Sequence, residues 1–148
     1  MISTPFFFAI LIVSVLDGGR FRWEPRVSTL IVVVAALVYI IGQIIVLWAK
    51  KVNRFFSSVV RIQKDRGQTV CKDGPYRFVR HPGYLGGLLF TIATPLVLGS
   101  WWGLIPVAIT LVLVFIRTYL EDKTLQSELE GYTDYSNETR YRLLPGIW

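Results

Sequence analysis

Long apolar runs alternate with short polar segments along the chain, and this pattern predicts membrane helices. The run from Ser28 to Trp48 is long enough to cross a hydrocarbon core, which takes roughly 20 helical residues. Two shorter runs, Tyr84–Leu98 and Trp101–Ile116, are separated only by Gly99 and Ser100. Such a short interruption predicts a tight turn, so the two runs are expected to form an antiparallel transmembrane hairpin.

A fourth apolar run opens the chain, from Ile2 to Leu16. No Lys or Arg precedes it and no small-residue cleavage site follows it, so it does not match a secretory signal. We interpret it as a short membrane helix. The expected fold is all-α, a polytopic membrane protein with about four transmembrane helices, in one domain over residues 1–148. The expected helices lie near residues 2–16, 28–49, 83–98 and 101–118.

Composition and charge refine this picture. The chain is 53% hydrophobic with a mean hydropathy of +0.49, which argues against a soluble fold. Its net charge of +6 is unevenly spread, because Lys50 to Arg80 holds nine basic residues against Asp65 and Asp73, whereas the Gly99-Ser100 turn is uncharged. The positive-inside rule therefore predicts cytoplasmic segments at 50–82 and 119–148, the latter a helical tail, with the turn outside.

A basic segment between membrane helices favours anionic lipid headgroups as partners over nucleic acid. We expect no nucleic-acid partner. Cys71 is the single cysteine, which excludes an intrachain disulfide and a Cys-type zinc site. No metal-ligand spacing occurs, so no metal is expected either. The pattern leaves the oligomeric state open.

The hairpin brings distant polar residues to the same depth. If the turn centres on Gly99-Ser100, residue numbers at equal depth sum to about 200. Arg80 and His81 then lie level with Leu120 and Glu121, so "RHP" before one helix faces "EDKT" after the other. Several basic and acidic side chains converge there, at the cytoplasmic interface.

Simpler roles exist for each of these residues. Arg77 and Arg80 are able to snorkel to lipid phosphates. The G-x-x-x-G spacing of Gly83 and Gly87, with Gly86 between them, suits close helix packing, but it also leaves backbone N–H groups open to a ligand at a helix N-terminus. Taken together, the residues favour a binding site, with ligand contact expected at Gly83 and helix packing at Gly87.

The C-terminal tail is expected to form a helix ending near Gly131, a short second helix and an extended end. Four residues at helical spacing are expected to pack as one face: Leu125, Leu129, Tyr132 and Tyr135. Arg140 and Arg142 alternate with neighbouring residues, which places both on one side of an extended segment. These two arginines are candidates for substrate binding.

The stretch "GPYRFVRHPGYLGG", the apolar hairpin and "RTYLEDKTLQSELEGYTDYSNETRYRLLPGIW" together resemble the isoprenylcysteine carboxyl methyltransferase-like family of membrane enzymes. That group is similar to the phospholipid N-methyltransferases. The shared signature is R-H-P-x-Y-x-G, a hydrophobic stretch and two adjacent acidic residues. It is matched here, within a resemblance running from about residue 17 to residue 148, by Arg80, His81, Pro82, Tyr84, Gly86, Glu121 and Asp122.

The resemblance implies methyl transfer from S-adenosylmethionine at the cytoplasmic ends of the hairpin and in the tail. Relatives usually carry Glu-Glu where this chain has Glu-Asp, so Asp122 is expected to play the lesser role, and relatives tend to have more membrane helices at the front. The implied catalytic residues are Arg80, His81 and Glu121. The implied cofactor-binding residues are Arg77, Arg80, His81, Gly83, Tyr84, Gly86, Glu121 and Asp122.

The methyl acceptor is left open as a hydrophobic or membrane-associated carboxylate, amine or thiol. A carboxylate needs no base, whereas an amine or thiol must lose a proton, for which His81 is the candidate. Two other functions stay open at this point. Membrane sterol reductases, which use NADPH, end in a similar "HPxY" segment, and a non-catalytic membrane protein could retain the same fold.

Overall fold

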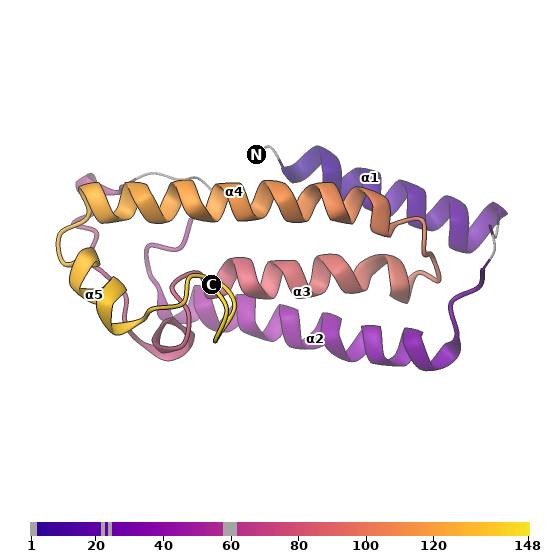
Figure 1. Cartoon of the computed structure of the whole chain (residues 1–148), viewed down its shortest axis with the longest axis horizontal. Coiled ribbons are helices and arrows are strands. Elements are labelled where there is room, and N and C mark those ends of the chain that lie inside the picture. The colour runs from indigo at the N-terminus through magenta and orange to yellow at the C-terminus, as the bar shows by residue number, and fades with distance from the viewer. Residues whose placement is uncertain (1–2, 22, 24, 58–61) are drawn as a thin grey trace. The chain divides into compact units, whose positions relative to one another are not determined.

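The computed structural model describes residues 3–21, 23, 25–57 and 62–148, and these residues form helices joined by turns and loops, without a strand (Figure 1). The all-α prediction is therefore confirmed for the described residues. In chain order the elements are α1 (Ser3–Val15), the π-helix η1 (Leu16–Phe21), α2 (Thr29–Val52), the 3-10 helices η2 (Lys64–Arg66) and η3 (Gly74–Arg77), α3 (Pro82–Val97), α4 (Leu104–Glu128) and α5 (Tyr132–Glu138).

Two of the described helices, α2 and α4, are long and apolar enough to cross a membrane, and α3 is a shorter apolar helix. All three lie where apolar runs were expected. Helix α4 continues past the expected end at residue 118, because Glu, Lys and Gln are good helix formers and a change to charged residues does not by itself end a helix. The number of transmembrane helices and the cytoplasmic position of the tail stay predictions.

The chain divides into two compact units, the first comprising residues 1–44 and 86–114 and the second residues 45–85 and 115–148. In the first unit, α2 and α3 approach closely at Gly42. A Cβ atom there would lie 2.7 Å from the carbonyl oxygen of Gly86 and 2.8 Å from the backbone nitrogen of Phe90. The Phe90 ring also meets Tyr39 of α2 and Phe7 of α1 edge-on. This contact fixes how α1, α2 and α3 pack.

The turn between α3 and α4 is longer than two residues and is tied to η1. Gly99 adopts a φ of 76°, a left-handed conformation that glycine accepts without strain. Ser100 is fully buried, and its hydroxyl donates to the Asp17 carboxylate and accepts the N–H of Gly103. The turn is therefore anchored by polar contacts within the first unit.

The helix packing expected at Gly87 is not found among the described residues, and the ligand contact expected at Gly83 stays a prediction. A Cβ atom on Gly83 would lie 2.6 Å from the Phe56 ring, so Gly83 is where a side chain packs against the helix. A Cβ atom on Gly87 would meet nothing within 4 Å. Sequence spacing identified small positions on the helix but did not indicate which of them a neighbour occupies.

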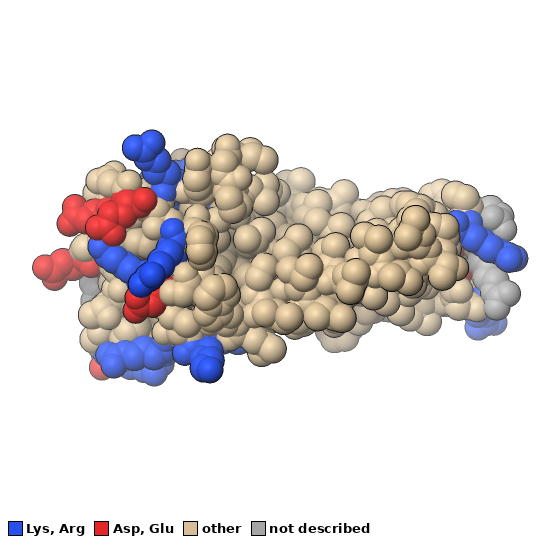
Figure 2. Space-filling view, turned by 90° about the horizontal axis from the view of Figure 1, so that it is seen from below, with Lys and Arg blue, Asp and Glu red and all other residues tan. Residues whose placement is uncertain are grey.

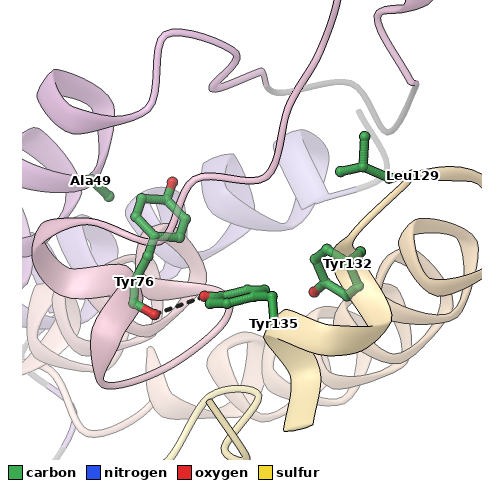
Figure 3. Close-up of a cluster of buried hydrophobic side chains, with 5 residues drawn as sticks. All are labelled: Ala49, Tyr76, Leu129, Tyr132 and Tyr135. Atoms are coloured by element: carbon green, nitrogen blue, oxygen red, sulfur yellow. Dashed lines mark hydrogen bonds between the residues drawn. The ribbon is translucent and has the colours of Figure 1, made fainter. Parts of the chain in front are cut away.

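The core of the second unit is a cluster of aromatic and small side chains (Figure 3). The Tyr135 hydroxyl donates to the backbone carbonyl of Tyr76 at 2.7 Å, which ties α5 to η3. Helix α5 begins after Gly131, whose φ of 78° turns the chain out of α4. The predicted packing face of the tail is confirmed, since the cluster consists of Ala49, Tyr76, Leu129, Tyr132 and Tyr135.

Residues 27–44 and 86–114 contain no Lys, Arg, Asp or Glu. Large apolar side chains are exposed along α2, among them Leu30, Leu37, Ile44 and Leu47. In Figure 2 the surface of these apolar segments is tan, without charged side chains. Such an exposed apolar surface is typical of helices that face lipid.

The predicted topology is testable by labelling single cysteines in a Cys71→Ala background with a membrane-impermeant thiol reagent. Ser100 is buried, so Trp102, which is exposed, is the better position in the turn, and exposed Phe78 reports on the basic segment. In right-side-out vesicles we expect Trp102→Cys to react and Phe78→Cys to stay unlabelled until the membrane is permeabilised. The opposite pattern would show that the topology is inverted.

Replacing Gly42 should loosen the contact between α2 and α3. The added methyl group would press on backbone atoms that have no rotamer to change, so Gly42→Ala should lower the free energy of unfolding by ~1–3 kcal/mol. Gly87→Ala is the matched control, because open space surrounds that position and alanine favours helix. Thermal unfolding in detergent measures both; equal melting temperatures would refute the close approach.

Candidate functional site

A single buried carboxylate, that of Asp122, organises the polar residues of the second unit. Its side chain is 1% exposed. Arg80 binds both of its oxygens, from Nε at 2.8 Å and from Nη2 at 3.0 Å. Arg142 Nε donates to it at 2.8 Å, and the Tyr132 hydroxyl donates at 2.8 Å. His81 Nε2 lies 3.3 Å away. The Asp122 carboxylate therefore joins α4 to the start of α3, to α5 and to the tail.

The Arg80 guanidinium is buried and largely committed to the protein. Besides the two bonds to Asp122, its Nη1 donates to three backbone carbonyls at 3.0–3.2 Å. Those carbonyls belong to Ser136, Thr139 and Arg140. Planar guanidinium groups suit such forked recognition. In this geometry Arg80 holds the end of α5 and the following tail in place.

Backbone hydrogen bonds attach the tail to the residues before α3. The N–H groups of Arg80 and His81 donate to the carbonyls of Tyr141 and Arg142, each at 2.9 Å. The Arg142 guanidinium lies over the rings of Tyr119 and Trp148 and is 29% exposed. Only its Nε carries a hydrogen bond within the described residues. Its terminal nitrogens can therefore bind an anion.

A second, more open group lies around Glu121. The Tyr84 hydroxyl donates to Glu121 Oε2 at 2.6 Å, and His81 Nδ1 lies 4.0 Å from Oε1. The Arg117 guanidinium lies 5.5 Å above the Tyr84 ring. Glu121 is 22% exposed, in contrast to the adjacent Asp122. The two neighbouring acids thus differ in surroundings, one enclosed by donors and one partly open.

Burial and the Asp122 charge both raise the pKa of Tyr132 far above its usual value. Burial likewise raises the pKa of Tyr135, and it raises the pKa of Tyr76 to about 12. These phenols stay protonated at physiological pH. They remain neutral and form hydrogen bonds without changing charge, which suits a supporting role around the carboxylate.

The depth argument from the sequence is confirmed, since Arg80 and His81 do meet the Glu121-Asp122 pair. The lesser role expected for Asp122 in cofactor binding stays a prediction, although in the structure Asp122 is the residue on which the other polar groups converge. Among the other predicted residues, Arg77 is 71% exposed and lies 3.7 Å from Asp73, outside this group of side chains.

The side chains of two further predicted residues take no part in the hydrogen bonds around Asp122 and Glu121. Arg140 is exposed, and only its backbone carbonyl takes part, through Arg80. Gly86 lies in the close contact between α2 and α3, beside Gly42. Tyr84 is in the group around Glu121, as the resemblance implied. The cofactor and substrate roles of all these residues stay predictions.

Sequence reasoning missed two contributors to the site. The sequence predicts Tyr132 as a packing residue only, but its hydroxyl also donates to Asp122, and Gln126 Nε2 donates to the same carboxylate at 3.1 Å. Both residues follow Asp122 in the chain. The i, i+4 spacing of Asp122 and Gln126 on a helix was the signal available for one of them; the Tyr132 contact depends on the turn at Gly131.

Comparison with protein families identifies the family of this chain. The family model for phospholipid methyltransferases matches residues 30–130, more than half of the chain. The chain therefore belongs to the phospholipid methyltransferase family. No curated protein matches it. The match contains the Arg80, His81 and Tyr84 segment and the acidic pair, and it ends before α5.

Family membership and the two apolar helices indicate a membrane protein of methyltransferase type. This agrees with the family that the signature resembled. It does not favour the sterol reductase alternative. Lipid substrates and membrane association are what the family suggests for this chain.

Removing the Asp122 charge should destabilise the second unit strongly. In Asp122→Asn, the guanidinium groups of Arg80 and Arg142 lose their counter-charge, and breaking a buried pair costs ~3–5 kcal/mol. We expect a lower melting temperature and faster proteolysis within residues 131–148. Asp134→Asn, on the exposed face of α5, is the matched control. Equal protease resistance in the two variants would contradict the central role of Asp122.

Proposed function

We propose that this protein transfers a methyl group from S-adenosylmethionine to a hydrophobic, membrane-associated acceptor. Family membership supports the methyl transfer. The observation that carries the assignment of the site is the contrast between the two adjacent acids: Asp122 is saturated by donors, whereas Glu121 is partly exposed and keeps one oxygen free of hydrogen bonds within the described residues. Glu121 is the residue we assign to the cofactor.

The donor set suits S-adenosylmethionine chemically. Its ammonium and ribose hydroxyl groups need a carboxylate, which Glu121 offers with its orientation held by Tyr84. Its carboxylate needs a cation, for which the terminal nitrogens of Arg142 are placed. The remaining predicted residues, Arg77, Gly83 and Gly86, make no hydrogen bond or ion pair with Glu121 within the described part of the chain, so their part in binding rests on the family resemblance alone. When bound, the cofactor supplies an electrophilic methyl group on a sulfonium.

The chain's own residues would then contribute mainly by orienting the two reactants. Methyl transfer is an in-line displacement, for which orientation supplies much of the rate. Arg80 and Asp122 hold the tail against the start of α3, and thereby hold Glu121, His81 and Arg142 in one region of the second unit. Arg80 is in this view a positioning residue.

The acceptor determines whether a base is needed. Lipid substrates are what the family suggests, and an amine headgroup would have to lose a proton before or during transfer. His81 is the candidate, since its ring nitrogens face the two acids. Arg140, exposed and without a side-chain hydrogen bond in the described residues, is assigned to the acidic part of the acceptor. The site is proposed to lie at the cytoplasmic membrane interface, as the charge distribution predicts.

Cofactor binding tests the assignment of Glu121. Titration calorimetry on the purified protein in detergent should show S-adenosylmethionine binding, and Glu121→Gln should weaken it about tenfold or more, since a hydrogen bond to a charged group is lost. The melting temperature should change little, because the amide oxygen still accepts from Tyr84. Glu130→Gln, an exposed change, is the control. Equal affinity in Glu121→Gln and wild type would place the cofactor elsewhere.

Activity and acceptor identity need a separate measurement. Membranes incubated with methyl-labelled cofactor and the protein should yield a labelled lipid, identifiable by chromatography and mass spectrometry. Arg140→Ala should lower the labelling without altering cofactor affinity or stability, because its exposed side chain makes no hydrogen bond or ion pair among the described residues. A protein that binds the cofactor but labels no membrane component would support the non-catalytic alternative.

A further inference from the structure

The first unit contains a buried carboxylate, that of Asp17, which none of the ion pairs among the described residues neutralises. Asp17, in η1, is 2% exposed, and its Oδ2 accepts a hydrogen bond from the Ser100 hydroxyl at 2.5 Å. Its other oxygen, Oδ1, is buried and has no hydrogen-bond partner in the described part of the chain. No described Lys, Arg or His forms an ion pair with it. A buried carboxylate in this condition is strongly unfavourable unless something neutralises it.

A second buried oxygen without a partner lies beside it. Ser14 is fully buried, and its Oγ makes no hydrogen bond among the described residues. Ser14 and Asp17 are three residues apart, a spacing that puts side chains on the same helical face. A Cβ atom on Gly103 would collide with Ser14 Oγ, and the Gly103 N–H donates to Ser100 Oγ at 3.0 Å. Both hydroxyls therefore lie against Gly103, and Asp17 is bonded to one of them.

A backbone carbonyl completes this group of oxygens. A Cβ atom on Gly18 would collide with the carbonyl oxygen of Leu98, so this oxygen lies against the residue that follows Asp17. Carboxylate, hydroxyl and carbonyl oxygens are the ligands of hard cations. No group of three or more His, Cys, Asp or Glu that could hold a metal ion occurs among the described residues, so the candidate ligands here are mostly neutral oxygens. A single carboxylate balances one positive charge.

We propose that Asp17, with Ser14, Ser100 and the carbonyl of Leu98, binds a monovalent cation of the sodium type. The ion neutralises the buried carboxylate and gives partners to Asp17 Oδ1 and Ser14 Oγ. It thereby links η1, which follows α1, to the turn between α3 and α4. Nothing in the proposed methyl transfer depends on this site, so the two proposals stand or fall separately.

Sodium-dependent stability of the purified full chain in detergent tests the proposal. Melting temperatures are compared in sodium chloride and in choline chloride at equal ionic strength, because choline is too large for the site. With sodium at tenfold its Kd, we expect a rise of about 3–6 °C. Asp17→Asn should abolish the rise and Ser14→Ala should reduce it, whereas Asp134→Asn, an exposed acid of the second unit, should keep it.

Binding of radioactive sodium gives a readout independent of melting. Wild type and Asp134→Asn should bind about one ion per chain, displaceable by unlabelled sodium, and Ser14→Ala should bind more weakly. If Asp17→Asn does not fold, the wild-type and Ser14→Ala titrations decide the question. Equal melting in both salts with no saturable sodium binding, or an undiminished sodium response in Ser14→Ala and Asp17→Asn, would overturn the proposal.

Discussion

The arrangement of the second unit depends on the buried Asp122 carboxylate. Two guanidinium groups, a phenol, an amide and an imidazole converge on its two oxygens, from positions up to 42 residues away from Asp122 in the chain. Such a carboxylate is costly to bury alone and favourable only when its donors are all in place. The start of α3, α5 and the tail are therefore coupled, because each supplies a donor that the same anion requires.

This coupling also explains why two adjacent acids have different surroundings. Helix geometry points neighbouring side chains about 100° apart, so Asp122 and Glu121 cannot both face the arginines. Asp122, with the shorter side chain, is enclosed at the junction with the tail, and Glu121 is left partly exposed with Tyr84 as its donor. A structural carboxylate thus sets the position of the one that we assign to the cofactor.

The first unit is held together by close apolar helix packing and not by buried ion pairs among its described residues. Its helical segments carry no charge along residues 27–44 and 86–114, and glycine provides specificity by letting the backbones of α2 and α3 meet at Gly42. Apolar side chains pack about equally well against lipid and against other helices, so they do not select one helix face. A glycine does select a face, because it lets another backbone approach closely at that position. Among the described residues of this unit, the side-chain hydrogen bond that joins different segments lies at the turn, where Ser100 binds Asp17.

The sequence by itself determined the helical class, the apolar segments, and the meeting of "RHP" with the acidic pair, because hydrophobic periodicity and hairpin depth depend only on residue spacing. All the signature residues lie within the part of the chain that the family model matches. The tertiary structure decided which acid is enclosed, which glycine packs against Phe56, and that Tyr132 reaches Asp122. Spacing gives a residue's depth and face, but its partners depend on how loops and the tail fold back, and those contacts are fixed by donors far away in the chain.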